Sequence, residues 1–192
     1  MKPASVRHLC AMALLAAVLG TQGCTLPAAN YSVSLPNTLA LREAGLPKIK
    51  VGEIRKEPRS RADVDKLRSR GSTLVSPYGS YTAYLREALT NELDHADLLD
   101  ANSTIRIDGT LLHNDIEGDA EREYAVLTAR FTVNRDGTVA YESTKTVRHE
   151  WDSSFVGAVA LPRSAANYRA GVQRLIAAFI ADPDFTKALR AR

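Results

Sequence analysis

The stretch YAVLTARFTVNRDGTVAYESTKTVRHEW, residues 124–151, predicts a β-hairpin. Apolar and polar side chains alternate on both sides of Asp136-Gly137, a pair that tolerates the positive φ angles of tight turns. The odd-numbered residues from Ala125 to Val133 are apolar, and the return strand places on one side Val139, Tyr141, Val147 and Trp151. Because the opposite side of both strands is polar, we expect a sheet that is covered on one face only.

Helical periodicity on either side of the hairpin supplies the cover for that face. Ser76-Pro77 suits a helix start, and apolar residues then recur at spacings of three and four as far as His95. A second such stripe runs from Tyr168 to Phe179, and a short last helix follows Asp182-Pro183. Further strands are predicted at 48–54 and 104–113. The predicted fold class is α+β: a two-layer domain with an antiparallel sheet of about four strands and helices on one face.

Length and composition bound the organisation of the chain. Its 192 residues are 45% apolar and 24% charged, which suits one globular domain, predicted at 48–192. Residues 24–47 contain three prolines and are expected to form a tether. Residues 55–70 carry seven basic and three acidic side chains, which predicts a solvated loop; contact with an anionic partner or with lipid headgroups is the alternative interpretation. This loop has no aromatic residue for stacking on bases, so no nucleic-acid partner is expected.

The first 23 residues have the pattern of a secretory signal peptide. Lys2 and Arg7 precede an uncharged apolar run from Leu9 to Leu19, which is too short to cross about 30 Å of hydrocarbon. Removing this segment leaves 23 basic and 22 acidic residues, a net charge of about +1. It also removes Cys10, so Cys24 would be the single cysteine of the mature chain and no internal disulfide could form.

The segment LGTQGC, residues 19–24, resembles a bacterial lipobox, in which a cysteine follows a small residue at the end of the apolar run. Gly23 and Cys24 fit this pattern, whereas Thr21 and Gln22 depart from it. The resemblance implies a diacylglycerol on the Cys24 thiol, cleavage just before Cys24, and a fatty acid such as palmitate on the new amino terminus. Because Thr25 is not aspartate, it also implies an outer-membrane lipoprotein that faces the periplasm. Cleavage by an ordinary signal peptidase nearby, for example after Ala28, is the alternative.

The order of lipobox, tether and small α+β domain resembles several envelope lipoproteins. These are the lipopolysaccharide-assembly lipoprotein, penicillin-binding-protein activator lipoproteins, auxiliary lipoproteins of ABC transporters and the amino-terminal domain of the Tol-system β-propeller protein. The resemblance spans roughly residues 48–190 and includes no diagnostic motif, so no functional residue is carried over. It implies an accessory role in envelope assembly, with another envelope protein as partner.

The sequence contains no recognisable catalytic pattern or cofactor motif. The glycine–serine pairs at 71–72 and 79–80 do not form a nucleophile elbow. Ser153 and Ser154 follow His149 along one strand, whereas a catalytic triad converges from separate elements. The acidic ladder from Asp115 to Glu123 lacks the glycine and the glutamate that an EF-hand needs at its sixth and twelfth positions. We therefore expect a non-catalytic protein, with the ladder as a solvated connection.

A small metal- or ligand-binding site is the alternative function. His113 and His149 are both in phase with apolar residues, and an up-down-up meander would bring them to the same end of the sheet. Two strand spacings separate their backbones by about 10 Å, which two imidazoles and a metal ion can span. Asp115 or Glu117 could complete such a site. Two solvated strand-end histidines are the simpler interpretation, and no metal is assigned.

Seven residues without a polar side chain, FVGAVAL at 155–161, connect the last predicted strand to the following helix. In one interpretation this run packs under the helix and completes the core. In the other it is an exposed loop that docks on a partner or touches lipid, since exposed apolar patches mark interaction sites. The candidate contact residues are Phe155, Val156, Val159 and Leu161.

Overall fold

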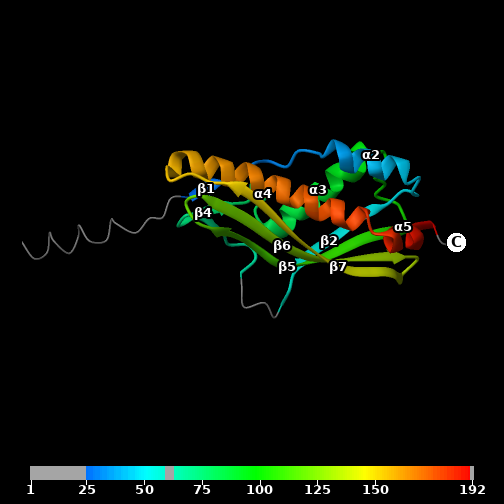
Figure 1. The fold of residues 1–192 in the computed structure, drawn as a ribbon. Coiled ribbons are helices and arrows are strands. Elements are labelled where there is room, and N and C mark those ends of the chain that lie inside the picture. Colours follow the sequence, from blue (N-terminus) through cyan, green and yellow to red (C-terminus); the bar gives the residue numbers. More distant parts are fainter. Residues whose placement is uncertain (1–24, 59–62, 191–192) are drawn as a thin grey trace, which may run out of the picture.

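The computed structural model describes residues 25–58 and 63–190, so the predicted signal peptide and Cys24 lie outside the described residues. Figure 1 shows the fold. Its elements, in chain order, are β1 (Thr25–Pro27), α2 (Leu35–Glu43), β2 (Lys50–Lys56), β3 (Leu67–Ser69), β4 (Ser72–Val75), α3 (Tyr81–His95), β5 (Ile105–Gly118), β6 (Arg122–Arg135), β7 (Thr138–Asp152), α4 (Gly157–Ile180) and α5 (Pro183–Arg190).

A four-stranded sheet in the order β2-β5-β6-β7 forms one layer of the molecule. The strands β5, β6 and β7 are an antiparallel meander, and the predicted turn lies at Asp136 and Gly137, which both have positive φ. The predicted α+β class is thus confirmed. The predicted antiparallel pairing is wrong for one strand, because β2 pairs in parallel with β5. The helix α3 connects these two strands, and such a crossover returns the chain to the same end of the sheet.

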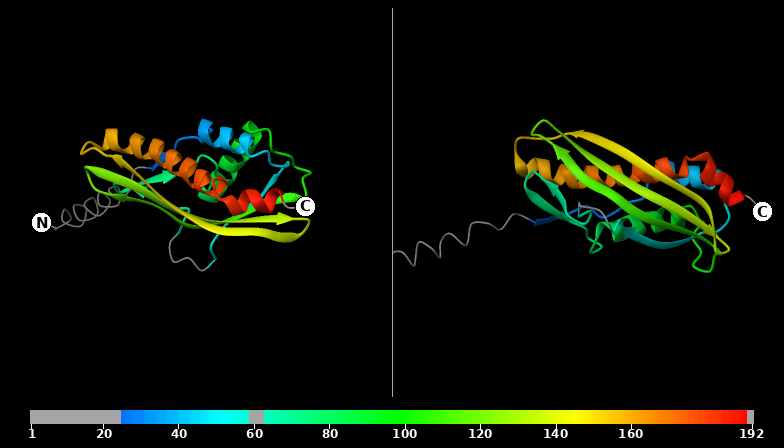
Figure 2. Two further views of the ribbon diagram at one scale, coloured as in Figure 1. Left: turned by 45° about the vertical axis from the view of Figure 1, so that its right-hand side comes forward. Right: turned by 90° about the horizontal axis from the view of Figure 1, so that it is seen from below.

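The helices cover one face of this sheet, and the core lies between the two layers (Figure 2). α4 packs on β6 and β7, whereas α3 packs on β2. Phe131 of β6 stacks on Phe179 of α4, with ring centroids 4.3 Å apart. The odd-numbered residues from Ala125 to Val133 are all buried, so the strand phase predicted from the alternation is confirmed. Val139 departs from it and is exposed, because the register shifts where β6 and β7 enter the turn.

Residues 25–47 are folded, which corrects the prediction of a tether. β1 adds to a small second sheet in the order β1-β4-β3, and α2 follows it. The buried carboxylate of Glu92 on α3 holds this segment: it accepts hydrogen bonds from the Tyr31 hydroxyl at 2.5 Å and from the Ser34 amide at 2.9 Å. Burial and this carboxylate raise the pKa of Tyr31. The segment is therefore ordered by a residue that lies far from it in the sequence.

The basic segment 55–70 is also more ordered than predicted. Val64 and Leu67 within it are buried, and Leu67–Ser69 forms β3 against β4. The Val64 carbonyl accepts a hydrogen bond from the buried side chain of Asn114 on β5, at 2.8 Å. Two apolar side chains and one strand pairing thus fix the second half of a segment whose charges predicted a solvated loop.

Both long helices begin at a different residue from the one predicted. α3 begins at Tyr81, where Ser80 rather than Ser76 is the N-cap and accepts a hydrogen bond from the Ala83 amide at 3.0 Å. α4 begins at Gly157, well before the predicted apolar stripe, and contains Pro162 in its second turn. The run 155–161 is therefore mostly the first part of a helix.

Candidate functional site

One end of the molecule gathers four segments that are distant in the sequence. Thr25 at the start of β1 pairs with Thr73 of β4, beside the turn that joins β3 to β4. Arg70 in that turn donates a hydrogen bond to the Asp119 carbonyl of the β5–β6 turn at 3.2 Å. The Ser153 amide, just before α4, donates to the Glu121 carbonyl of the same turn at 2.8 Å. Figures 1 and 2 show β1, the β5–β6 turn and the start of α4 together, and we call this the Thr25 end.

A buried carboxylate at the Thr25 end joins three of these segments. Glu123 of β6 is 2% exposed. It accepts hydrogen bonds from three serine hydroxyls: Ser69 of β3 at 2.8 Å, Ser153 after β7 at 2.9 Å, and Ser164 of α4 at 2.7 Å. These bonds offset the cost of removing the charge from water. They also fix the start of α4 against the small sheet that begins with β1.

The buried position of Glu123 differs from the one that the sequence pattern predicts. Glu123 belongs to the acidic ladder, which was interpreted as a solvated connection, and that interpretation is wrong for this residue. A signal was present, because Glu123 continues the odd-numbered alternation of Ala125 and Leu127 that predicts the core face of β6. Ser164 likewise lies four residues before the buried Tyr168, on the same face of α4.

The apolar patch at the start of α4 is open to solvent. Phe155, Val156 and Val159 are 76%, 58% and 41% exposed, and Leu161 is half-buried. Only Ala160 of the run is buried. The interpretation that packs this run into the core is therefore wrong for Phe155, Val156 and Val159. Contact of these residues with a partner stays a prediction.

His113 and His149 lie on opposite faces of the sheet, so the structure contradicts a site shared by the two. The register of β5 shifts between Leu111 and His113, and after the shift His113 is opposite Thr128 on the open face. His149 is buried under α4, and its Nε2 lies 3.1 Å from Oδ1 of Asn167. Burial lowers the pKa of the His149 imidazole.

The same shift brings three potential metal ligands together on the open face of β5. The ligand atoms of His113, Asp115 and Glu117 all lie within 4.8 Å of one another. The Tyr124 hydroxyl donates a hydrogen bond to Glu117 at 2.6 Å, and the Arg148 guanidinium lies over the Tyr124 ring at 3.2 Å. One imidazole and two carboxylates form a donor set that zinc or a similar divalent ion accepts.

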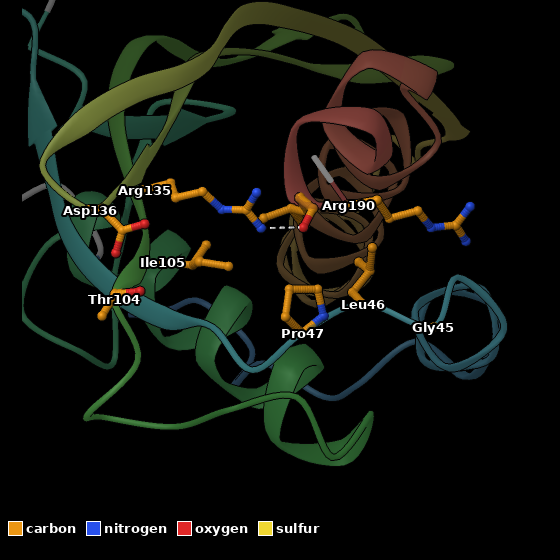
Figure 3. A pocket seen from close by; sticks show the side chains of 9 residues that line it. Gly45, Leu46, Pro47, Thr104, Ile105, Arg135, Asp136 and Arg190 are labelled. Atoms are coloured by element: carbon orange, nitrogen blue, oxygen red, sulfur yellow. Dashed lines mark hydrogen bonds between the residues drawn. The ribbon is translucent and has the colours of Figure 1, made fainter. Parts of the chain in front are cut away.

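A cavity of about 720 Å³ lies at the opposite end of the molecule, between the α2–β2 connection, the β6–β7 turn and α5 (Figure 3). Arg135 points into it and donates a hydrogen bond to the Leu189 carbonyl, while Arg190 donates to the Ala44 carbonyl. Both guanidinium groups are thus bound to backbone.

Comparisons with known proteins give the fold. No protein-family model matches the chain, and no curated protein is similar to it in sequence. A Xanthomonas campestris protein of the DUF330 family is similar in structure, with a TM-score of 0.56 and 13% identity over 85% of this chain and 96% of that one. At this identity the likeness shows a shared fold alone.

Two further solved structures have lower TM-scores. A candidate lipoprotein from Caulobacter crescentus gives 0.47, with 13% identity over 82% of this chain and 98% of that one. A minor lipoprotein from Acinetobacter baumannii gives 0.43, with 12% identity over 76% of this chain and 96% of that one. No conclusion about this chain follows from scores this low.

Among the described residues, no helix has the length and apolar character needed to cross a membrane.

Proposed function

We propose that this chain is a non-catalytic lipoprotein, anchored in the outer membrane through acylated Cys24, which faces the periplasm and assists another envelope protein. One observation carries the proposal: Cys24 follows a signal-like apolar run within five residues and directly precedes Thr25, the first described residue and the start of β1. A lipid on Cys24 would lie at the Thr25 end. Each buried methylene of an acyl chain contributes about 0.8 kcal/mol, so two or more chains anchor a domain stably.

The fold supports cleavage before Cys24 over cleavage after Ala28. Cutting after Ala28 would remove all three residues of β1 and its pairing with β4. It would also remove Ala28, which is buried and whose amide donates a hydrogen bond to the Val75 carbonyl at 2.8 Å. Cleavage before Cys24 leaves the small sheet intact.

The described serines support a non-catalytic role. Ser153 and Ser164 each donate a hydrogen bond to Glu123, and no histidine lies between hydroxyl and carboxylate in this described cluster. His149 of β7, four residues before Ser153, is bound to Asn167 instead. The apolar patch of Phe155, Val156, Val159 and Leu161 is the surface that we propose for contact with the envelope.

The test is incorporation of labelled palmitate by the full-length protein in a bacterial host. The unmutated protein should be labelled and recovered in the outer membrane. Cys24→Ala should take up no label and keep its signal peptide, whereas Cys10→Ala should be labelled like the unmutated protein. Absence of label from the unmutated protein would contradict the lipid anchor. Affinity capture from intact envelopes would then identify the protein partner.

Metal binding is the second candidate function, moved from the His113/His149 pair to the cluster of His113, Asp115 and Glu117. The observation that favours it is the convergence of their ligand atoms within 4.8 Å. Titration with Zn²⁺ should give one bound ion for the unmutated protein and none for His113→Ala. His95→Ala is the control, because His95 is exposed and lies on α3. No binding by the unmutated protein would remove this candidate.

A further inference from the structure

The apolar patch and the proposed lipid attachment lie at the same end of the molecule. Thr25 pairs with Thr73, and Thr73 pairs with Arg68, which places Thr25 roughly 10 Å from Arg68 across two strand spacings. The Oγ atom of the next residue, Ser69, lies 3.0 Å from the Oγ atom of Ser164 in α4, and both hydroxyls bind Glu123. Cys24 is one further Cα spacing from Thr25, about 3.8 Å. A lipid on Cys24 therefore brings the bilayer close to the first turns of α4.

The patch is held rigidly with respect to this attachment point. Glu123 binds Ser153 on one side of the patch and Ser164 on the other, and the same carboxylate binds Ser69 of the small sheet. The Ser154 hydroxyl accepts a hydrogen bond from the Val156 amide at 3.2 Å, which fixes the turn that carries Phe155. Phe155 and Val156 are thus presented by a defined turn.

The chemistry of the patch suits the interfacial region of a bilayer. The run 155–161 contains no charged side chain. Arg163 at its border is exposed and donates a hydrogen bond to the Ser153 carbonyl at 3.3 Å, and Arg70 lies at the same end. Apolar side chains with a guanidinium group at their border match acyl chains beneath phosphate headgroups, while the exposed carboxylates of Glu121 and Asp152 at this end would have to stay in water.

We propose that the three exposed residues of the apolar patch, Phe155, Val156 and Val159, insert into the same lipid leaflet that holds the acyl chains of Cys24, as a second membrane attachment. This inference rests on the lipid anchor proposed above. Anchoring through Cys24 makes insertion of the patch an intramolecular step, which needs little intrinsic affinity. A protein partner on this surface would have to enter the space between the domain and the bilayer.

The test uses the mature acylated protein, produced from the full-length chain, with one added cysteine. Phe155→Cys is labelled with an environment-sensitive fluorophore, and Val139→Cys is the matched control because Val139 is 57% exposed at the β6–β7 turn, the opposite end of the sheet. Both proteins are reconstituted into vesicles of phosphatidylethanolamine with a minor fraction of phosphatidylglycerol, and some of the lipids carry a quencher near the headgroup. Their melting temperatures should equal that of the unlabelled protein.

We expect both proteins to float with the vesicles. The probe at position 155 should be quenched at least about twofold more than the probe at position 139, because apolar groups at the membrane interface lie about 5–10 Å deep, near the quencher. Flotation with equal quenching overturns the second attachment and leaves the anchor intact. Failure to float overturns the anchor and with it this inference. A 155 probe that stays in water on vesicles but is shielded in intact outer membranes assigns the surface to a protein and also overturns the lipid contact.

Discussion

Glu123 illustrates how a single buried charge can connect three parts of a chain. Its carboxylate accepts hydrogen bonds from hydroxyls on β3, after β7 and in α4, and within the described residues none of its hydrogen-bond partners is cationic. Glu123→Ala removes three hydrogen bonds to a charged acceptor, two from the buried hydroxyls of Ser69 and Ser164 and one from the half-buried Ser153, so the free energy of unfolding should fall by about 2–4 kcal/mol. Urea denaturation measures this difference.

The control for this prediction is Glu121→Ala, because Glu121 is exposed in the neighbouring turn. Its effect should stay within about 0.5 kcal/mol. Equal effects of the two substitutions would mean that the serine hydroxyls find other partners, and that Glu123 does not fix the start of α4.

Asp182, between α4 and α5, makes stability depend on pH in the acid range. Hydrogen bonds from Lys145 and Tyr141 of β7 hold its pKa at about 2, below the ordinary 3.8. Because the folded state binds the proton less readily than the unfolded state, Asp182 stabilises the fold above about pH 4. This contribution is lost as the pH falls toward 2. Asp182→Asn should lower the free energy of unfolding at pH 5 and should flatten its decline between pH 4 and pH 2, as measured by urea titrations. The control is Asp152→Asn, at the exposed end of β7, which should show the same decline as the unmutated protein.

At the level of single elements, the alternation of β6 determines which side chains tolerate a charge. Phe131 is fully buried against Phe179, and Phe131→Asp should cost several kcal/mol, comparable to the whole stability of a small domain. Leu89→Asp in α3 should be equally damaging, because Leu89 is 2% exposed. Thr128→Asp should be mild, since Thr128 lies on the open face and bonds to Thr146 there. Thermal melting compares the three; equal damage at 128 and 131 would contradict the strand phase.

Sequence patterns were sufficient where the interactions are local. Alternation and the Asp136-Gly137 turn predicted the hairpin, and apolar spacing predicted the main helices. The patterns failed where a distant residue decides. Glu92 orders the segment around Tyr31, sixty-one positions away, and one shifted residue in β5 moves His113 to the other face of the sheet. The number of prolines in a segment does not reveal the contact with Glu92, and the alternation of residues along a strand does not reveal the register shift.

The candidate site was predicted in part. Phe155, Val156 and Val159 were identified from the length of their apolar run, and one of two interpretations placed them at the surface. Which interpretation holds depends on where α4 begins, and Val156, its N-cap residue, makes no side-chain capping bond. The buried cluster around Glu123 was not predicted, because its serines come from three segments that only the folded chain brings together.

Across the whole molecule, Glu92 joins the amino-terminal segment to the rest of the domain. It is fully buried and binds Tyr31, Ser34 and Asn37. Glu92→Ala should therefore release residues 28–43 before the main sheet unfolds. Limited proteolysis should cut this segment at least about tenfold faster than in the unmutated protein, since a loss of 1.4 kcal/mol raises the open population tenfold. Asp94→Ala, at an exposed position of α3, should not change the rate.

The β1 strand begins one residue after Cys24, and this has a consequence for where the protein can act. A flexible linker of some twenty residues would let a domain take many positions and orientations relative to its lipid anchor. A chain that is folded from Thr25 onward has no such linker, so the distance that it reaches from the lipid is set by the dimensions of the domain itself. The fourteen residues of β6 extend for roughly 45 Å at about 3.4 Å each. Under the proposed anchoring of Cys24 in the bilayer, the tip at Asp136 would lie no farther than about that length from the lipid, and a partner of this tip would have to approach within that distance.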